Sequence, residues 1–314
     1  MAEDRSTAPD GRTSADEVAE PPVVLHDVDF FYTAHDPEPG VQPEVELEAA
    51  EDVTQVFAGL NLSLPAGVVS LVGQNGSGKS TLLLLAGARL FPAAGEVKLF
   101  GEDTRRFAPA HEDYAIEQRR NEVVSFVYQN MEFETQDSIG DLMEFVYENG
   151  FHRDKKPEFL RELHATLELE PVLSKRTQQL SKGELQRAII AFSLLYGSRI
   201  IMLDEPVFAL EDYQKHRVFE MLSDFAARTG TSVYYSVHEL ELTRRYSQYT
   251  ALFYGSGAAA AAGDGGAGTV RVGPTAELTA KEQIEEAFQV PIDLLHKKEG
   301  LYRETLLKLS RQKP

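Results

Sequence analysis

The chain has 314 residues, 42% of them hydrophobic, which is enough apolar material for a large domain with a packed core. It contains no cysteine, which excludes disulfides, thiolate metal sites and cysteine nucleophiles. Its formal net charge of −19 argues against nucleic acid as a main partner, because phosphate binding requires a basic surface.

The N-terminal segment predicts no structure of its own. Residues 1–20 are rich in Ala, Asp, Glu, Ser and Thr without an apolar period, so we expect a disordered acidic tail there. No basic segment followed by an apolar stretch begins the chain, and this argues against a signal peptide. No apolar run approaches the roughly 20 residues that a membrane-spanning helix needs. We therefore expect a cytoplasmic protein, with any membrane-spanning part on another chain.

An acidic insertion separates the first two expected strands. Residues 23–32 are strand-like, and the apolar pattern resumes at Val56 after a Pro-containing acidic stretch at 35–52. Residues 1–52 hold 15 Asp and Glu against two Arg, so most of the negative charge lies in the tail and near this insertion. We interpret these segments as solvated, with a role as an interaction tail as the alternative.

A glycine-rich motif follows the next expected strand. Residues 68–72 are almost all apolar and end at a glycine, which is typical of a buried parallel strand, and 81–90 predicts a helix. The segment between them matches G-x-x-x-x-G-K-[ST]. We call it the P-loop, and it consists of Gly73, Gln74, Asn75, Gly76, Ser77, Gly78, Lys79, Ser80 and Thr81.

The P-loop predicts nucleotide binding. Its glycines allow backbone N–H groups to point at phosphate oxygens, and the following helix N-terminus adds partial positive charge. We expect Lys79 to reach the β- and γ-phosphates and the Ser80 hydroxyl to bind Mg²⁺. Kinases, GTPases and helicases also use such a loop, so other features must decide the reaction.

Strand and helix patterns alternate in the rest of the chain. Residues 131–180 are mostly helical in pattern and predict an inserted helical subdomain. Apolar strands are expected at 199–203 and 232–237, with a helix at 182–196 before them. This alternation predicts an α/β fold in which helices cover a parallel sheet.

The C-terminal part is expected to be an extension of this core. Residues 256–268 form an Ala/Gly-rich stretch that predicts a flexible loop. In the extension that follows, 269–314, we expect a strand at 269–272 and helices at 281–288 and 302–309.

Two motifs narrow the choice of reaction. The strand at 199–203 runs directly into Asp204 and Glu205. The first carboxylate is placed to lie beside Mg²⁺, and the second to polarise a water for attack on a phosphate. Upstream, Ser181 and Glu184 predict a capping box at the start of a helix, where an exposed serine is a second anion-binding device.

Together, these motifs resemble those of the ATP-binding cassette (ABC) family. Leu-Ser-Lys-Gly-Glu at 180–184 is similar to the Leu-Ser-Gly-Gly-Gln signature of that family and lies in the right order between the P-loop and Asp204. The resemblance spans roughly 23–255, and we place the nucleotide-binding domain at 21–255. It implies a P-loop NTPase parallel-sheet core with an antiparallel β subdomain and an inserted α-helical subdomain.

The resemblance also implies roles for single residues. Gln129 is similar to the family's glutamine that contacts Mg²⁺ and the membrane partner, His238 to its switch histidine at the γ-phosphate, and Tyr32 to the aromatic that stacks on adenine. Taken alone, His238 would be interpreted as structural and Tyr32 as a half-buried strand residue. The implied catalytic pair is Glu205 and His238; the Mg²⁺ ligands are Ser80, Gln129 and Asp204; the ATP contacts are Tyr32, the P-loop, Gln129, Ser181, Gly183 and Glu184.

Two residues depart from the family pattern. Lys182 replaces the first glycine of the signature, and Glu211 stands where the family usually has the D-loop aspartate. Both departures concern the expected interface between two subunits and leave the expected P-loop intact.

The resemblance implies an ATPase subunit of a transporter. Two copies, most simply identical, would sandwich two ATP molecules and drive a separate permease at the inner face of the cell membrane. Residues 174–177 lack the Gly-Glu-Arg-Gly element of exporters, and 276–293 resembles the C-terminal stretch of importers for iron chelates, haem and cobalamin. We therefore expect an importer, with a substrate-binding protein as a further partner.

Two alternatives remain open at this stage. One is a non-transport cytosolic ABC ATPase of the assembly type. The other is a degenerate cassette that binds ATP with little turnover, which Lys182 and Glu211 favour and which Glu205 and His238 argue against.

Overall fold

The structure is a computed structural model that describes residues 20–33, 53–108, 114–152, 156–255, 269–292 and 294–295. Four predicted segments lie outside these residues: the tail before residue 20, the insertion at 35–52, the Ala/Gly stretch at 256–268 and the helix at 302–309. None of the helices within the described ranges is long and apolar enough to cross a lipid bilayer.

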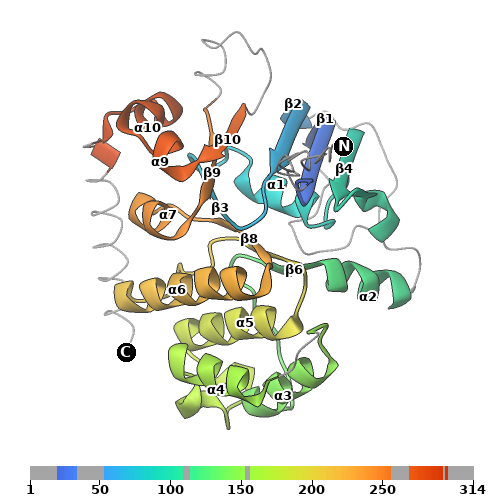
Figure 1. Cartoon of the computed structure of the whole chain (residues 1–314), viewed down its shortest axis with the longest axis vertical. Coiled ribbons are helices and arrows are strands. Elements are labelled where there is room, and N and C mark those ends of the chain that lie inside the picture. The colour runs from blue at the N-terminus through green and yellow to red at the C-terminus, as the bar shows by residue number, and fades with distance from the viewer. Residues whose placement is uncertain are drawn as a thin grey trace, which may run out of the picture.

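A six-stranded sheet forms the centre of the molecule (Figure 1). Its order is β10-β9-β3-β8-β7-β6, and all neighbours pair in parallel except β10 and β9. The strands are β3 (Val68–Val72), β6 (Val124–Val127), β7 (Ile200–Leu203), β8 (Ser232–Ser236), β9 (Tyr249–Phe253) and β10 (Val270–Pro274). Every residue of β3, β7 and β8 is buried, as expected for strands covered on both faces.

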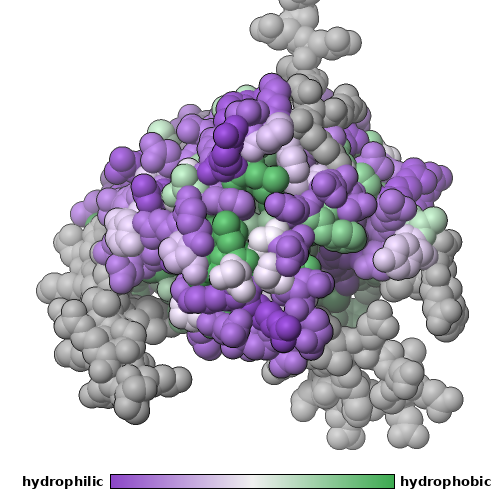
Figure 2. All heavy atoms as spheres, turned by 90° about the horizontal axis from the view of Figure 1, so that it is seen from below, coloured by the Kyte–Doolittle hydropathy of each residue, from purple (hydrophilic) through white to green (hydrophobic). Residues whose placement is uncertain are grey.

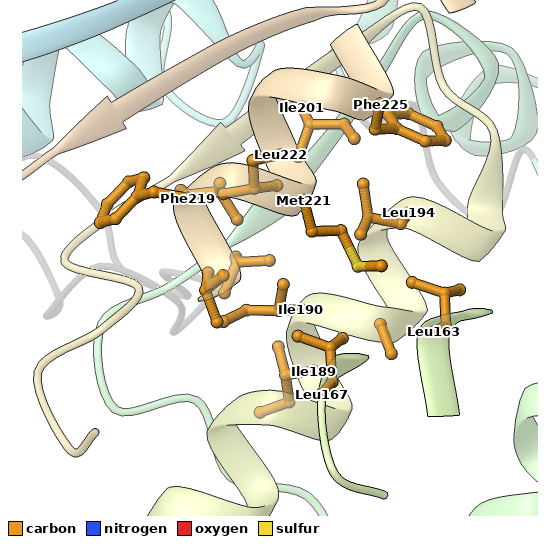
Figure 3. Close-up of a cluster of buried hydrophobic side chains, with 14 of the residues drawn as sticks. Leu163, Leu167, Ile189, Ile190, Leu194, Ile201, Phe219, Met221, Leu222 and Phe225 are labelled. Carbon is orange, nitrogen blue, oxygen red and sulfur yellow. The ribbon is translucent and has the colours of Figure 1, made fainter. Parts of the chain in front are cut away.

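Alternate residues of the central strands point into two different cores. Ile201 of β7 joins the core beneath the sheet, which α5 (Lys182–Tyr196) and α6 (Asp212–Thr229) complete. Figure 3 shows side chains of these two helices meeting there. Met202, the next residue, joins the core on the opposite face, because successive side chains of a strand point to opposite faces.

A second, antiparallel sheet lies on that opposite face. Its order is β2-β1-β4-β5, with β1 (Val23–Thr33), β2 (Val53–Leu64), β4 (Ala94–Leu99) and β5 (Glu102–Asp103). Leucines of α1 (Lys79–Ala86) share one core with residues of both sheets. The helix that follows the P-loop is therefore fixed between the two sheets.

A helical region lies at the lower end of the molecule in Figure 1. It contains α3 (Ile139–Asn149), α4 (Pro157–Thr166), η2 (Glu170–Val172) and η3 (Thr177–Gln179), and it leads into α5. Two elements connect β4 and β5 to β6: η1 (Thr104–Phe107) and α2 (Tyr114–Val123). Figure 2 looks onto the molecule from below and shows a green apolar area bordered by hydrophilic side chains.

The C-terminal part adds a third, smaller core. This part of the chain contains β10, α9 (Thr275–Leu278) and α10 (Lys281–Phe288), and it lies beside α7 (Leu240–Tyr246). Ile284 and Ala287 of α10 pack in one cluster with Val72 at the end of β3 and Leu240 at the start of α7. The predicted fold class, an α/β core with an antiparallel β subdomain and a helical region, is confirmed by this arrangement.

Candidate nucleotide-binding site

The P-loop connects the carboxyl end of β3 to the start of α1. Gly78 is the N-cap of α1 and has φ 97°, a left-handed conformation that a glycine adopts without steric cost. At Gly73, a Cβ atom would lie only 2.6 Å from the Cβ of Phe253, so the loop passes too close to β9 for any side chain. Gln74, Asn75, Gly76 and Ser80 are exposed, which leaves the outer rim of the loop open.

Lys79 lies inside the curve of this loop. Its Nζ donates hydrogen bonds to the carbonyl oxygens of Gly73, at 2.9 Å, and Gln74, at 2.8 Å. Burial lowers the pKa of Lys79, and the nearby carboxylates of Glu205 and Asp204 act in the opposite direction. The lysine and the two acids predicted from separate motifs therefore lie within electrostatic reach of one another.

Four predicted residues follow three strands that neighbour one another in the sheet. Gln129 follows β6, Asp204 and Glu205 follow β7, and His238 follows β8. The strands pair in parallel, with Val127 opposite Leu203 and Leu203 opposite Tyr235, so their carboxyl ends lie along one edge. This edge is where ligands bind in open parallel sheets.

Glu205 is the centre of the contacts at this edge. Its Oε2 accepts a hydrogen bond from the Gln129 amide at 2.9 Å, and its Oε1 lies 2.7 Å from Nε2 of His238. Its backbone has φ 47°, which is uncommon for a residue with a side chain. A partly buried carboxylate held from two sides is arranged to orient a water molecule or a phosphate oxygen.

Ser236 is a further residue of the site that the sequence motifs did not single out. Its fully buried hydroxyl donates to Asp204 Oδ1 at 2.5 Å and accepts from the backbone N–H of Glu205 at 2.9 Å. It thereby fixes both acids relative to β8. Its place two residues before His238, at the end of a buried strand, is the signal that could have identified it.

Tyr32 lies at the end of β1 and contacts the other side of the P-loop. Its hydroxyl is 3.2 Å from the Thr81 hydroxyl, and its ring packs edge-on against Phe30, with 5.0 Å between the ring centroids. The half-buried ring is therefore beside the first turn of α1. An aromatic at this position has the surface needed to stack on a base.

The donor atoms predicted for Mg²⁺ suit that ion. Asp204 offers a carboxylate, Ser80 a hydroxyl and Gln129 an amide oxygen, and Mg²⁺ prefers such oxygen ligands. In the described part of the chain, no group of three or more His, Asp or Glu forms a metal cage by itself. One carboxylate with neutral oxygens fits an ion that nucleotide phosphates help to hold.

The signature residues lie elsewhere in the molecule. Ser181 is the N-cap of α5: its Oγ accepts from the Glu184 N–H at 3.3 Å, while a Glu184 carboxylate oxygen accepts from the Ser181 N–H at 2.7 Å. The predicted capping box is confirmed. Gly183 approaches the segment before α6, since a Cβ at Gly183 would lie 3.1 Å from the Ala209 carbonyl oxygen.

The structure thus brings some predicted residues together and leaves others apart. Lys79, Gln129, Asp204, Glu205 and His238 form one cluster with the P-loop. Within the described ranges, no hydrogen bond or ion pair connects the signature to the P-loop of the same chain.

The two departures from the family pattern are exposed. Lys182 is the first residue of α5; its side chain is 78% exposed, and its Nζ lies 4.0 Å from a carboxylate oxygen of Glu132. Glu211 is the N-cap residue of α6. Neither residue contacts the P-loop cluster through a hydrogen bond or ion pair that the described residues make.

Comparisons with known proteins agree with this geometry. The family model described as "ABC transporter" matches residues 57–208. The chain is 32% identical over 231 residues to the nickel import ATP-binding protein NikO of Rhodobacter capsulatus, covering 72% of this chain and 86% of NikO. It is 31% identical to the lipoprotein-releasing system ATP-binding protein LolD of Anaeromyxobacter dehalogenans, covering 69% of this chain and 94% of LolD.

A solved structure gives the same picture of the fold. The dimeric ATP-binding cassette MJ0796, bound to ADP and Pi, aligns with a TM-score of 0.58 at 23% identity. The alignment covers 73% of this chain and 93% of that cassette.

Proposed function

The chain belongs to the ABC transporter family as one of its ATP-hydrolysing cassettes, and on that premise we propose that it drives a separate membrane permease. The observation that carries the proposal is the placement of Glu205 between Gln129 and His238 at the edge of the sheet beside the P-loop. That arrangement has the parts that hydrolysis of a bound nucleotide requires.

We assign the following roles to the residues of this site. The backbone N–H groups of the P-loop and the Lys79 ammonium bind the phosphates of ATP, and Tyr32 stacks on the adenine. Glu205 orients the attacking water, and His238 contacts the γ-phosphate. Asp204, Ser80 and Gln129 hold Mg²⁺, which when bound neutralises charge on the phosphates.

Two copies of the chain complete each site. Ser181, Gly183 and Glu184 lie at an exposed helix N-terminus, which is a device for binding anions. Since, among the described residues, no hydrogen bond or ion pair joins them to the P-loop of their own chain, we assign them to the nucleotide of a second subunit. The dimeric MJ0796 cassette, which shares the fold, supports such an assembly.

Replacing Glu205 by Gln tests the catalytic assignment. The variant keeps the size of the side chain and leaves the P-loop unchanged, but it loses the charge that polarises water, so we expect ATP binding to persist. Hydrolysis should fall by about 10²–10⁴-fold, the usual contribution of a general base. The matched control is Glu220→Gln on the exposed face of α6, which should hydrolyse ATP like the wild type. Equal rates for Glu205→Gln and the wild type would show that the assignment is wrong.

An apolar groove in the helical region is where we place the permease. It has a volume of about 380 Å³ and lies between β6, α3 and α5. Met131, Phe133, Leu142, Val146 and Phe192 are among the residues that line it. Phe145, on the same helix as Leu142, is 63% exposed. An exposed aromatic next to an apolar groove is typical of a protein-binding surface.

Arg89 gives this groove a charge. The Nε atom of Arg89 is buried without a hydrogen-bond partner, as is the hydroxyl of Ser125, which also lines the groove. Burial is the main cause that lowers the pKa of Arg89. An apolar helical segment of the permease that carries one carboxylate would satisfy both the apolar walls and this cation.

Co-purification measures this contact. Arg89→Met should weaken retention of the membrane permease that we propose as partner, while leaving the ATPase rate of the isolated chain unchanged. Arg161→Met, which removes a 75% exposed arginine from α4, is the matched control and should retain the permease. Equal retention by both variants would contradict the proposed anchor.

We further propose import as the direction of transport. The expectation depends on the missing Gly-Glu-Arg-Gly element and on the likeness of residues 276–293 to importers. NikO is named for import and LolD for lipoprotein release, so these relatives do not choose between directions. A substrate-binding protein and a location at the inner face of the cell membrane belong to the same proposal. ATP-driven uptake into right-side-out vesicles supports it, and uptake only into inverted vesicles contradicts it.

A further inference from the structure

Lys215 is a buried lysine close to the site that no motif identifies. It lies in the first turn of α6, four residues after Glu211, and only 8% of it is exposed. Lysine is rarely buried to this extent unless it is paired. Its Nζ lies 2.5 Å from Oε1 of Glu239 and 3.5 Å from Oδ1 of Asp212.

Glu239 is the residue that follows His238. The side chain of His238 contacts Glu205, that of Glu239 contacts Lys215, and that of Leu240 packs in the C-terminal core with Ile284. Three consecutive residues are therefore held by three different parts of the structure. The pairing of Glu239 with Lys215 ties the backbone next to His238 to α6 through charge.

The other side of the same helical turn has a different partner. Arg217 Nη1 donates to Glu168 Oε1 at 2.8 Å, and Tyr213 and Gln214 also donate to the Glu168 carboxylate. Glu168 belongs to the turn after α4, in the helical region. The start of α6 is thus fixed on one side to the helical region and on the other, through Lys215, to the segment that carries His238.

A gain in folding stability does not by itself explain why a lysine is buried at position 215. A buried ion pair often contributes little net stability, because removing both charges from water costs about as much as their attraction returns. What such a pair does supply is a fixed geometry between the elements that carry it. Here the fixed geometry is the position of the backbone at His238 relative to α6.

We propose that Lys215 is a positioning residue, which holds Glu239 and thereby keeps His238 directed at Glu205 and the γ-phosphate. The proposal rests on the function proposed for His238. Lys215 touches neither nucleotide nor water in this role. Its loss should therefore lower the rate of hydrolysis more than the affinity for ATP.

Kinetics of the full-length chain provide the first test. Lys215→Met keeps the aliphatic stem and removes the charge, and we expect kcat to fall about tenfold with KM for ATP changed less than about twofold. Lys215→Arg should recover most of the rate, because it restores a cation opposite Glu239. Arg217→Met is the matched control: it removes an ion pair from the same turn that faces Glu168, and its kcat should stay within about twofold of the wild type.

The imidazole of His238 provides a readout that a purely structural role would not change. In chains with labelled histidine, the His238 signal is assigned by its loss in His238→Ala. We expect this signal to shift in Lys215→Met and in Glu239→Gln and to stay in place in Arg217→Met. If Lys215→Met does not fold, Glu239→Gln removes the same ion pair at its more exposed residue. That variant then tests whether the pair positions His238.

These outcomes separate the two proposals. A wild-type kcat in both Lys215→Met and Glu239→Gln overturns the positioning role. A lowered kcat with an unmoved His238 signal also overturns it, because the effect would then arise elsewhere. If the wild-type chain itself fails to hydrolyse ATP, the proposed function is wrong, and the His238 signal still reports whether Lys215 positions this ring.

Discussion

At the scale of single residues, the buried hydroxyl of Ser236 gives a direct prediction. In Ser236→Ala, Asp204 loses the hydrogen bond to one carboxylate oxygen and the Glu205 N–H loses its acceptor. A buried polar group left without its partner costs about 1–3 kcal/mol, so we expect the free energy of unfolding to fall by that amount. The rate of ATP hydrolysis should fall as well, because both acids lose the support that orients them.

Ser193→Ala is the control for Ser236→Ala. The Ser193 hydroxyl is also buried, but it donates only to the Ile190 carbonyl oxygen one helical turn earlier. Chemical denaturation should therefore show a smaller loss for this variant, and its ATPase rate should match the wild type. Similar losses of stability and activity in both variants would contradict the role given to Ser236.

The sequence motifs nominate candidate site residues more readily than they indicate how those residues are connected. The P-loop, Asp204, Glu205 and His238 are recognisable because each follows an apolar strand. The contact of Glu205 with both Gln129 and His238 depends on the order of β6, β7 and β8 in the sheet, which sequence spacing does not contain.

At the scale of elements, local signals determined how well boundaries were predicted. The helix expected at 182–196 is α5, since a capping box begins it and Gly197, with φ 77°, ends it. The helix expected at 81–90 instead spans Lys79–Ala86. It begins earlier because Gly78 provides the left-handed N-cap, and it ends at Gly87, where a Cβ would lie 2.8 Å from the Phe126 ring.

The anchoring of α6 by Glu168 predicts a dependence of stability on pH. Hydrogen bonds, first that from Gln214, lower the pKa of Glu168 in the folded chain. The unfolded chain therefore takes up a proton at this carboxyl at a higher pH than the folded chain. The stabilisation is complete above the ordinary glutamate pKa of about 4.3 and is lost as the pH falls through the lower folded value.

Thermal unfolding between about pH 3 and pH 6 tests this dependence. Glu168→Gln should lower Tm at the upper end of the range and make Tm less sensitive to acid. Glu158→Gln is the control, since its ion pair with Arg161 is largely exposed and such pairs contribute little. A wild-type acid dependence in Glu168→Gln would rule out this contribution.

At the scale of the whole molecule, the separation of the signature from the P-loop predicts complementation between defective chains. Lys79→Ala removes the cation that we propose binds phosphate, and Ser181→Arg blocks the signature, so each homodimer should be inactive. A mixed dimer has one site with both parts intact. With random pairing, a one-to-one mixture should regain roughly a quarter of the wild-type ATPase rate. A mixture as inactive as its components would contradict a site shared between two copies.

The contacts between distant parts of the chain were the least predictable from sequence. The C-terminal extension lies more than 200 positions after the P-loop in sequence, yet the Gln74 side chain donates to the Phe288 carbonyl oxygen at 2.7 Å. In the same way, Ile284 packs with Val72, directly before the P-loop. Hydrophobic periodicity predicts that α10 has an apolar face, but only the fold shows what that face covers.

The backbone angle of Glu205 sets stability against activity. A left-handed conformation at a residue with a side chain costs of the order of 1–3 kcal/mol, which glycine in its place would largely avoid. Relief of this strain would remove the carboxylate that we propose orients the attacking water. A cassette that no longer had to hydrolyse ATP would be relieved of this strain by losing the glutamate. The presence of Glu205 at a strained position therefore argues for a working ATPase and against an inactive module.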